Sequence, residues 1–146
     1  MSSWTDKPDY EPAPLLQPAF FKFVRQNSVN ADCAVASLAM MFGVTYEESL
    51  AACLLVCPEV LHSGMQFKRM KQAAMMLGGK VKSIRRGEYD VEEATGVLYV
   101  ETKKDAHAVY LWAGRIMEGN GEGWLDPEDY FTHNKWKPGS LLVRVS

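Results

Sequence analysis

Residues 32–43 have the sequence Asp-Cys-Ala-Val-Ala-Ser-Leu-Ala-Met-Met-Phe-Gly. Asp32 is a suitable residue to cap the start of a helix, and Gly43 suits the left-handed position that ends one. The pattern therefore predicts a helix that starts at or next to Cys33. Its residues are apolar almost all round, which places the helix in the core. The fold is expected to form around this buried helix, with a cysteine at its start.

Two more helices are predicted to follow. Thr45-Tyr-Glu-Glu48 is a capping box, and it opens a second helix that ends before Pro58. A third is predicted from about Met65 to Leu77, with Ser63 as its cap and Gly78-Gly79 as its end. All three helices come from the first 80 or so residues of the chain.

Past Gly79 the hydrophobic period changes to that of strands. A tight hairpin is predicted at Ala113-Gly114, and Asp126-Pro127 is expected to start a short helical turn toward Phe131. Residues 20–25 fit either a short strand or the approach to the first helix. The predicted strands are 80–85, 96–101, 106–112, 115–118 and 141–145.

This order of elements predicts an α+β fold in which amino-terminal helices pack on one face of a carboxyl-terminal antiparallel sheet. The chain has 146 residues, 47% of them hydrophobic, which suits one domain with a core of its own. Residues 1–19 carry four prolines among polar residues and are predicted to form an extended leader. The single folded domain is then residues 20–146.

The overall charge excludes some partners. The 16 Lys and Arg residues nearly balance the 18 Asp and Glu residues, so no net field attracts nucleic acid or anionic lipid. A basic stretch near Phe67, residues 68–86, is better explained by a solvated helix face and a lysine-protected edge strand. No apolar run is long enough to cross a bilayer, and no membrane partner is expected. The amino end lacks the order of a secretory signal, so the expected location is the cytoplasm, where the three cysteines stay reduced.

One set of residues points to chemistry. Cys33 is predicted at a helix start, where the macrodipole favours a thiolate, and His107 is predicted near the start of an apolar strand. An imidazole beside the thiol can carry its proton. Unpaired N–H groups at the helix start can stabilise an oxyanion, and the amide of Gln26 can supply a second donor. These groups would meet where the helical half joins the sheet.

The imidazole needs a partner on its other nitrogen. If Ala113-Gly114 is a two-residue turn, Asn120 lies opposite His107, and Glu118 lies on the same face of the sheet as His107. Asn120 and Glu118 are equal candidates to hold the imidazole. Asp126, in the loop beyond the hairpin, ranks third.

The chain resembles the papain-like cysteine peptidases in three places, which are Gln26, the run from Cys33 to Met40, and His107-Ala-Val-Tyr-Leu. Within these peptidases, residues 20–126 are most similar to the bacteriocin-processing (double-glycine) peptidases and their stand-alone relatives. The resemblance implies a papain-like fold and an acyl-thioester mechanism without cofactor or metal. It implies Cys33 as nucleophile, His107 as base and Gln26 in the oxyanion hole.

The chain differs from the family pattern in the longer spacing between Gln26 and Cys33 and in Ala34, where the family usually has glycine. The family's acidic-proline pair is either altered at Glu118-Gly119 or displaced to Asp126-Pro127. Two functions follow: a small stand-alone cysteine hydrolase (peptidase or amidase), or an inactive papain-like domain that binds a peptide or partner protein. In both, the partner is a peptide or protein. The oligomeric state and the bond type are left open.

The two other cysteines have a simpler interpretation. Cys53 and Cys57 are four residues apart on one helix, and His62 follows beyond Pro58. Two thiols without a second pair are weak evidence for a metal site, so core packing is the better explanation.

Overall fold

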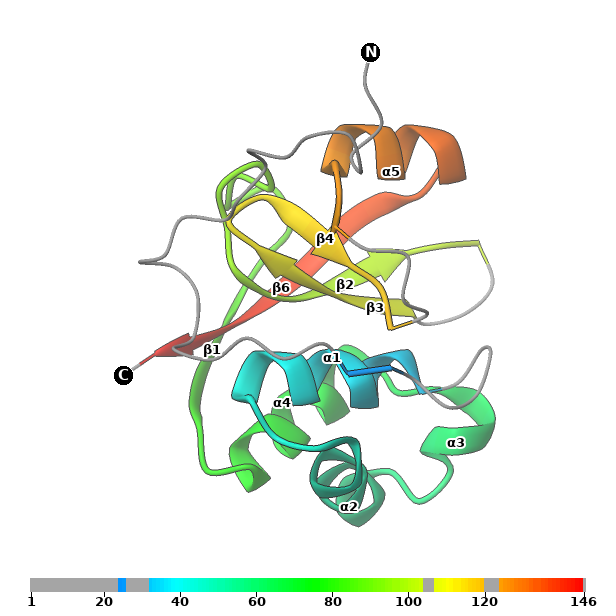
Figure 1. The fold of residues 1–146 in the computed structure, drawn as a ribbon, viewed down its shortest axis with the longest axis vertical. Helices are drawn as coiled ribbons and strands as arrows, with labels where there is room; N and C mark the ends of the chain where they lie inside the picture. Colours follow the sequence, from blue (N-terminus) through cyan, green and yellow to red (C-terminus); the bar gives the residue numbers. More distant parts are fainter. Residues whose placement is uncertain (1–23, 26–31, 104–106, 120–123, 146) are drawn as a thin grey trace.

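The predicted succession of helices and then a sheet is confirmed by a computed structural model (Figure 1). The structure describes residues 24–25, 32–103, 107–119 and 124–145. The helices are α1 (Cys33–Phe42), α2 (Tyr46–Val56), α3 (Val60–Ser63), α4 (Phe67–Met76) and α5 (Pro127–Asn134). The strands are β1 (Lys80–Ile84), β2 (Gly96–Glu101), β3 (His107–Trp112), β4 (Arg115–Met117), β5 (Trp124–Leu125) and β6 (Lys137–Val145).

The strands form one antiparallel sheet with the order β1-β6-β2-β3-β4-β5. The last strand of the chain therefore lies between β1 and β2, and the rest of the sheet is a series of neighbours in sequence. β1 is an edge strand and carries the exposed Lys80 and Lys82, which agrees with the prediction of a lysine-protected edge.

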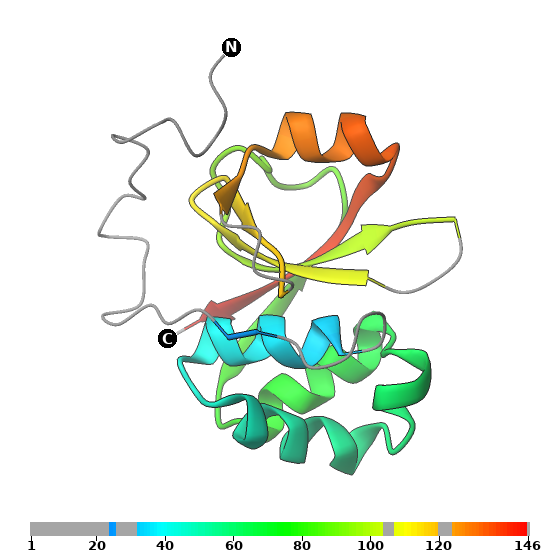
Figure 2. The same ribbon diagram turned by 45° about the vertical axis from the view of Figure 1, so that its right-hand side comes forward.

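The sheet separates two apolar clusters. Helices α1 to α4 lie on one side of it, and α5 lies on the other (Figures 1 and 2). The larger cluster joins α1 and the other amino-terminal helices to Tyr110 and Trp112 of β3. The smaller one joins Tyr130 of α5 to alternate residues of the same strands, Val109 and Leu111 among them. Because strand side chains alternate in direction, β3 serves both cores.

Helix α1 begins at Cys33 and ends at Phe42, as predicted, with Gly43 in the left-handed conformation. The expected cap at its start is wrong in one respect. The side chain of Asp32 makes no capping hydrogen bond and instead accepts one from the hydroxyl of Tyr46 at 2.6 Å. A fully buried carboxylate needs a strong donor, and the phenol of α2 supplies it.

The region after Pro58 differs from the prediction. The capping box of Thr45 and the end of α2 before Pro58 are confirmed. The short helix α3 was not predicted, and it places Ser63 at the end of one helix instead of at the cap of the next. Gly64, with a φ of 75°, turns the chain after α3, so α4 starts two residues later than expected, with Gln66 at its cap position.

In the carboxyl-terminal half, two predicted elements were too short and one strand was missed. The helical turn after Asp126 is a full helix, α5, and the two-residue strand β5 was missed. β6 starts at Lys137 and not at residue 141, although it contains Pro138 and Gly139. Residues 137–140 lie beyond the end of β1, which pairs only with Leu141 to Val145, so this part of β6 tolerates a proline.

The hairpin at Ala113-Gly114 is confirmed, with Leu111 opposite Ile116 and Tyr110 opposite Met117. Both turn residues have positive φ, 48° and 78°, as a type I′ turn requires. A Cβ on Gly114 would lie 2.0 Å from the carbonyl oxygen of Glu92. The turn therefore packs tightly against the loop before β2.

We expect Gly114→Ala to lower the free energy of unfolding by about 2–4 kcal/mol, because it adds steric overlap to an unfavourable φ. Gly87→Ala is the matched control. Gly87 also has a positive φ, of 84°, but a Cβ there meets nothing within 4 Å. Urea denaturation should give a loss of only about 1 kcal/mol for that control. Equal losses for the two variants would contradict the packing described for Gly114.

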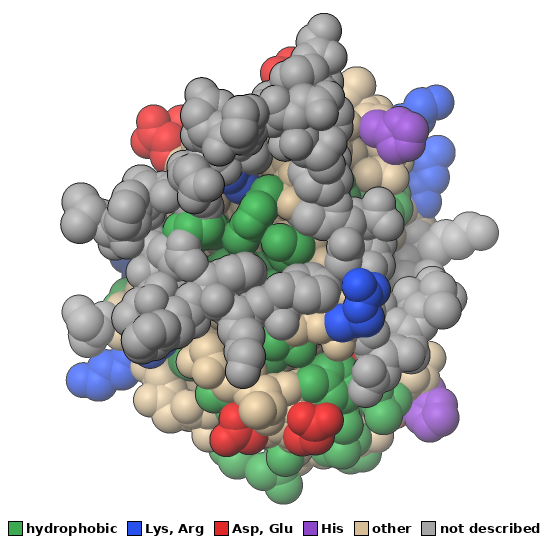
Figure 3. All heavy atoms as spheres, in the orientation of Figure 1, with side chains coloured by type: hydrophobic (Ala, Val, Ile, Leu, Met, Phe, Trp, Pro, Cys, Tyr) green, Lys and Arg blue, Asp and Glu red, His purple; other side chains and the backbone are tan. Residues whose placement is uncertain are grey.

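The described surface carries charges of both signs, and Figure 3 shows them scattered over one face of the molecule. Hydrophobic side chains gather at the helical end of this face. In the helical half, the exposed large ones are Leu54, Leu55, Leu61, Met75 and Met76. Among the described residues, no helix is both long enough and apolar enough to cross a membrane.

Candidate active site

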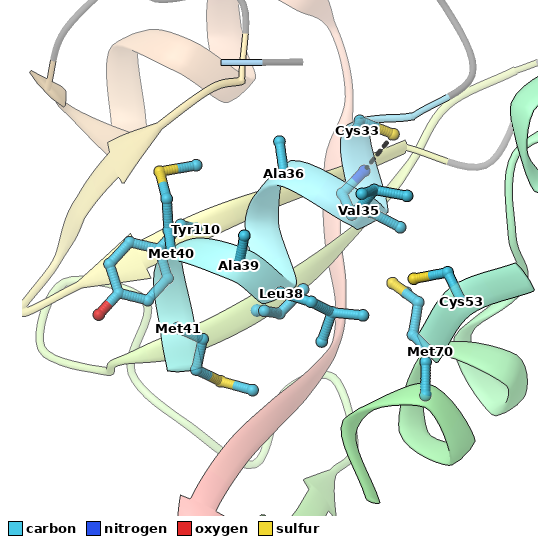
Figure 4. Close-up of a cluster of buried hydrophobic side chains, with 14 of the residues drawn as sticks. Cys33, Val35, Ala36, Leu38, Ala39, Met40, Met41, Cys53, Met70 and Tyr110 are labelled. Carbon is cyan, nitrogen blue, oxygen red and sulfur yellow. Dashed lines mark hydrogen bonds between the residues drawn. The ribbon is translucent and has the colours of Figure 1, made fainter. Parts of the chain in front are cut away.

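Cys33 is the first residue of α1 and lies against β3. Its side chain is buried, with 4% of the residue exposed, and its Sγ accepts a hydrogen bond from the backbone N–H of Ala108 at 3.3 Å (Figure 4). The first N–H groups of a helix have no acceptor within it. The sulfur therefore lies at the positive end of the helix and at the edge of the apolar core.

His107 is the first residue of β3, directly before Ala108. The thiol of Cys33 lies close enough to the imidazole to help raise its pKa. Its Nε2 lies 3.1 Å from Oε2 of Glu118. The structure thus brings the thiol, the imidazole and a carboxylate together in a row.

Of the candidates to hold the imidazole, Glu118 is the one that the structure places on it. Glu118 directly follows β4, on the face of the hairpin that the predicted register gave it. Asp126 instead accepts a hydrogen bond from the N–H of Asp129 at 3.1 Å and caps α5. Asn120 and Gln26 lie outside the described residues.

Two aromatic residues of the site were not predicted from the sequence. The hydroxyl of Tyr130, on α5, donates a hydrogen bond to Oε2 of Glu118. The ring of Trp136 lies 5.4 Å from that of His107 and 5.9 Å from that of Tyr130. A tyrosine on the apolar face of α5 needs a hydrogen-bond partner, and this requirement was the available signal. Tyr130 lies within the predicted turn, but only the longer helix α5 gives it a defined apolar face.

The electrostatics of the site favour a charged imidazole. Burial alone lowers the pKa of His107, but the hydrogen bonds and negative charges of Cys33 and Glu118 outweigh it. Together they raise this pKa from the ordinary 6.5 to about 10. The imidazole lies against Glu118, which is itself largely buried, with 13% of its side chain exposed.

A raised pKa of His107 has a consequence for stability. The protonated imidazole stabilises the folded state fully below about pH 6.5, and this contribution is lost as the pH rises through about 10. We therefore expect the stability difference between the wild type and His107→Gln to be largest below pH 6.5 and to shrink toward pH 10. Urea denaturation across this range measures it. A difference that is constant or grows with pH would contradict the charged pair.

The remaining cysteines lie in different surroundings. Cys53 is fully buried, and its burial raises its pKa to about 12. Burial and the charge of Glu59 also raise the pKa of Cys57. No group of three or more His, Cys, Asp or Glu side chains that could hold a metal occurs in the described part of the chain. These two thiols pack in the helical half, as the sequence indicated.

The sequence matches no family model and no curated protein. Its fold matches solved structures. The peptidase domain of Streptococcus ComA, a bifunctional ABC transporter involved in a quorum-sensing pathway, is 19% identical with a TM-score of 0.58, and the match covers 86% of this chain and 98% of that domain. The same domain from Streptococcus mutans, in complex with a small-molecule inhibitor, is 15% identical with a TM-score of 0.57, over 86% and 100% of the two chains.

A double-glycine motif protease from an AMS/PCAT transporter, in complex with the leader peptide, is 19% identical. Its TM-score is 0.60, over 88% of this chain and 93% of that one. Likeness at such low identity concerns the fold. The predicted resemblance to the bacteriocin-processing peptidases is confirmed at that level: the chain has the α+β, papain-like fold of double-glycine peptidase domains, with its helices in the amino-terminal half and its sheet in the carboxyl-terminal half.

Proposed function

We propose that this protein is a cysteine hydrolase that cleaves an amide or peptide bond through a thioester on Cys33. The observation that carries the proposal is the row of side chains from Cys33 through His107 to Glu118. Such a row supplies a nucleophile, a proton carrier and a group that orients the carrier. No metal or cofactor is needed for this chemistry.

In the first half of the reaction, the thiolate of Cys33 attacks the carbonyl carbon of the substrate and forms a C–S bond. The electron pair of the carbonyl moves to its oxygen, and the N–H groups at the start of α1 stabilise the resulting oxyanion, with the amide of Gln26 as a second donor. The imidazolium of His107 then gives its proton to the leaving nitrogen. The C–N bond breaks, and the amine departs.

In the second half, water attacks the thioester and gives a proton to the neutral imidazole. The C–S bond breaks, the acid is released, and the thiolate and imidazolium are restored. Because Nε2 of His107 is bound to Glu118, the other ring nitrogen is the one that serves Cys33. Glu118 keeps the ring in this orientation throughout and stabilises its charge.

The proposed substrate is a peptide or a peptide segment of a protein. One solved relative in fold was captured with a leader peptide, and another with an inhibitor. The three cysteines are all free thiols, which agrees with a reducing compartment, and we propose the cytoplasm.

An activated acyl donor tests the proposal without knowledge of the substrate. Mixing the protein with p-nitrophenyl acetate should release a burst of about one p-nitrophenol per protein, since acylation precedes slower hydrolysis. Peptide mass spectrometry should find the acetyl group on Cys33. A protein that gives no burst, or that carries the acetyl group on Cys53 or Cys57, would instead fit the inactive, peptide-binding alternative.

A further inference from the structure

Glu118 receives two hydrogen bonds on the same oxygen. Its Oε2 accepts from the hydroxyl of Tyr130, and the same atom lies 3.1 Å from Nε2 of His107. Tyr130 comes from α5, which covers the face of the sheet opposite the amino-terminal helices. The row of side chains that starts at Cys33 therefore continues to a fourth member.

Glu118 carries a long side chain at the end of a strand. It follows the last residue of β4, so it is outside the paired part of the hairpin. A glutamate also has one more rotatable bond than an aspartate or asparagine, and ordering it costs more conformational entropy. A donor from a rigid helix can hold the carboxylate in the one rotamer that reaches the imidazole.

Tyr130 is well suited to be that donor. Tyr130 is 6% exposed. Its ring packs against that of Phe131 at 5.2 Å and against that of Trp136 at 5.9 Å between centroids. Trp136 also contacts the ring of His107. The position of the phenol ring is thus set by packing that does not involve its hydroxyl.

We propose that Tyr130 is a positioning residue of the active site: its hydroxyl holds the carboxylate of Glu118 against the imidazole of His107. This inference rests on the proposed function and extends it. Tyr130 touches no reacting atom and acts only through Glu118. Burial and the charge of Glu118 raise the pKa of Tyr130, so the phenol stays protonated and remains a donor.

A double-mutant cycle tests this inference, with p-nitrophenyl acetate as the probe and the acylation rate of Cys33 as the readout. Tyr130→Phe keeps the ring and removes only the hydroxyl. It should slow acylation on the order of tenfold, as expected for a lost hydrogen bond to a charged group. In the Glu118→Ala background, the same substitution should have almost no further effect. An equal, additive loss in both backgrounds would overturn the inference, because it would mean that Tyr130 acts independently of Glu118.

Tyr89→Phe is the matched control. Tyr89 is a part-buried tyrosine of the same apolar cluster, and its hydroxyl donates to the carbonyl oxygen of Gly139 at 2.5 Å, away from the imidazole. It should leave the acylation rate unchanged. NMR of the imidazole adds a second readout: Tyr130→Phe should lower the pKa of His107, and Tyr89→Phe should not.

The proposed function and the role of Tyr130 can be refuted separately. If the wild type is not acylated on Cys33, the proposed function fails, whatever Tyr130 does. If the wild type is acylated and Tyr130→Phe reacts at the same rate with the same pKa of His107, only the positioning role fails.

Discussion

Replacing Cys33 with alanine should abolish acylation by p-nitrophenyl acetate and hydrolysis of any amide substrate, with a loss of at least about 10³-fold. No other described thiol can replace it, because Cys33 is the thiol that acts on the imidazole, and Cys53 and Cys57 are not. The readout is the burst of p-nitrophenol together with peptide mapping of the adduct.

Cys53→Ala and Cys57→Ala are the matched controls, since each removes one buried thiol and should leave the burst intact. The fold should survive the loss of Cys33, because the change removes one sulfur at the start of α1, and circular dichroism can check this. Acylation that persists in Cys33→Ala would show that the chemistry lies elsewhere.

Replacing His107 with alanine should slow acylation of Cys33 by about 10²–10⁴-fold, the usual range for the loss of a positioned acid–base group. In the proposed mechanism, the imidazole both pairs with the thiol and delivers a proton to the leaving group. It also links Cys33 to Glu118, so the whole row is lost with it. Stopped-flow measurement of p-nitrophenol release gives the rate directly.

His133→Ala and His62→Ala are suitable controls for that experiment. Both histidines are exposed and belong to α5 and α3, outside the row of site residues. They should acylate at the wild-type rate. A similar rate for His107→Ala and these controls would contradict the role proposed for His107.

The sequence was sufficient to predict what depends on local rules. The start of α1 at Cys33, the capping box at Thr45 and the two-residue turn at Ala113-Gly114 each follow from a few adjacent residues. The turn then fixed the register, and the register placed Glu118 on the face of His107. This is why a residue 11 positions from His107 could be named as a candidate before its contact was known.

Local rules do not predict contacts between elements that are distant in the sequence. Asp32 had the right residue type for a cap, but a phenol from α2 offered its buried carboxylate a better partner. The last strand was predicted only from Leu141, but β6 runs through Pro138, which is tolerated because β6 has no neighbour on one side there. Tyr130 and Trp136 reach the site because α5 folds back over the sheet, which no local pattern specifies.

Alkylation by iodoacetamide at neutral pH tests directly whether Cys33 is the reactive thiol, because all three thiols of one native protein compete for the same reagent. We expect peptide mass spectrometry to find Cys33 modified first, while Cys53 and Cys57 react only after unfolding. Prior modification of Cys53 or Cys57, or equal labelling of the three in the folded protein, would contradict it.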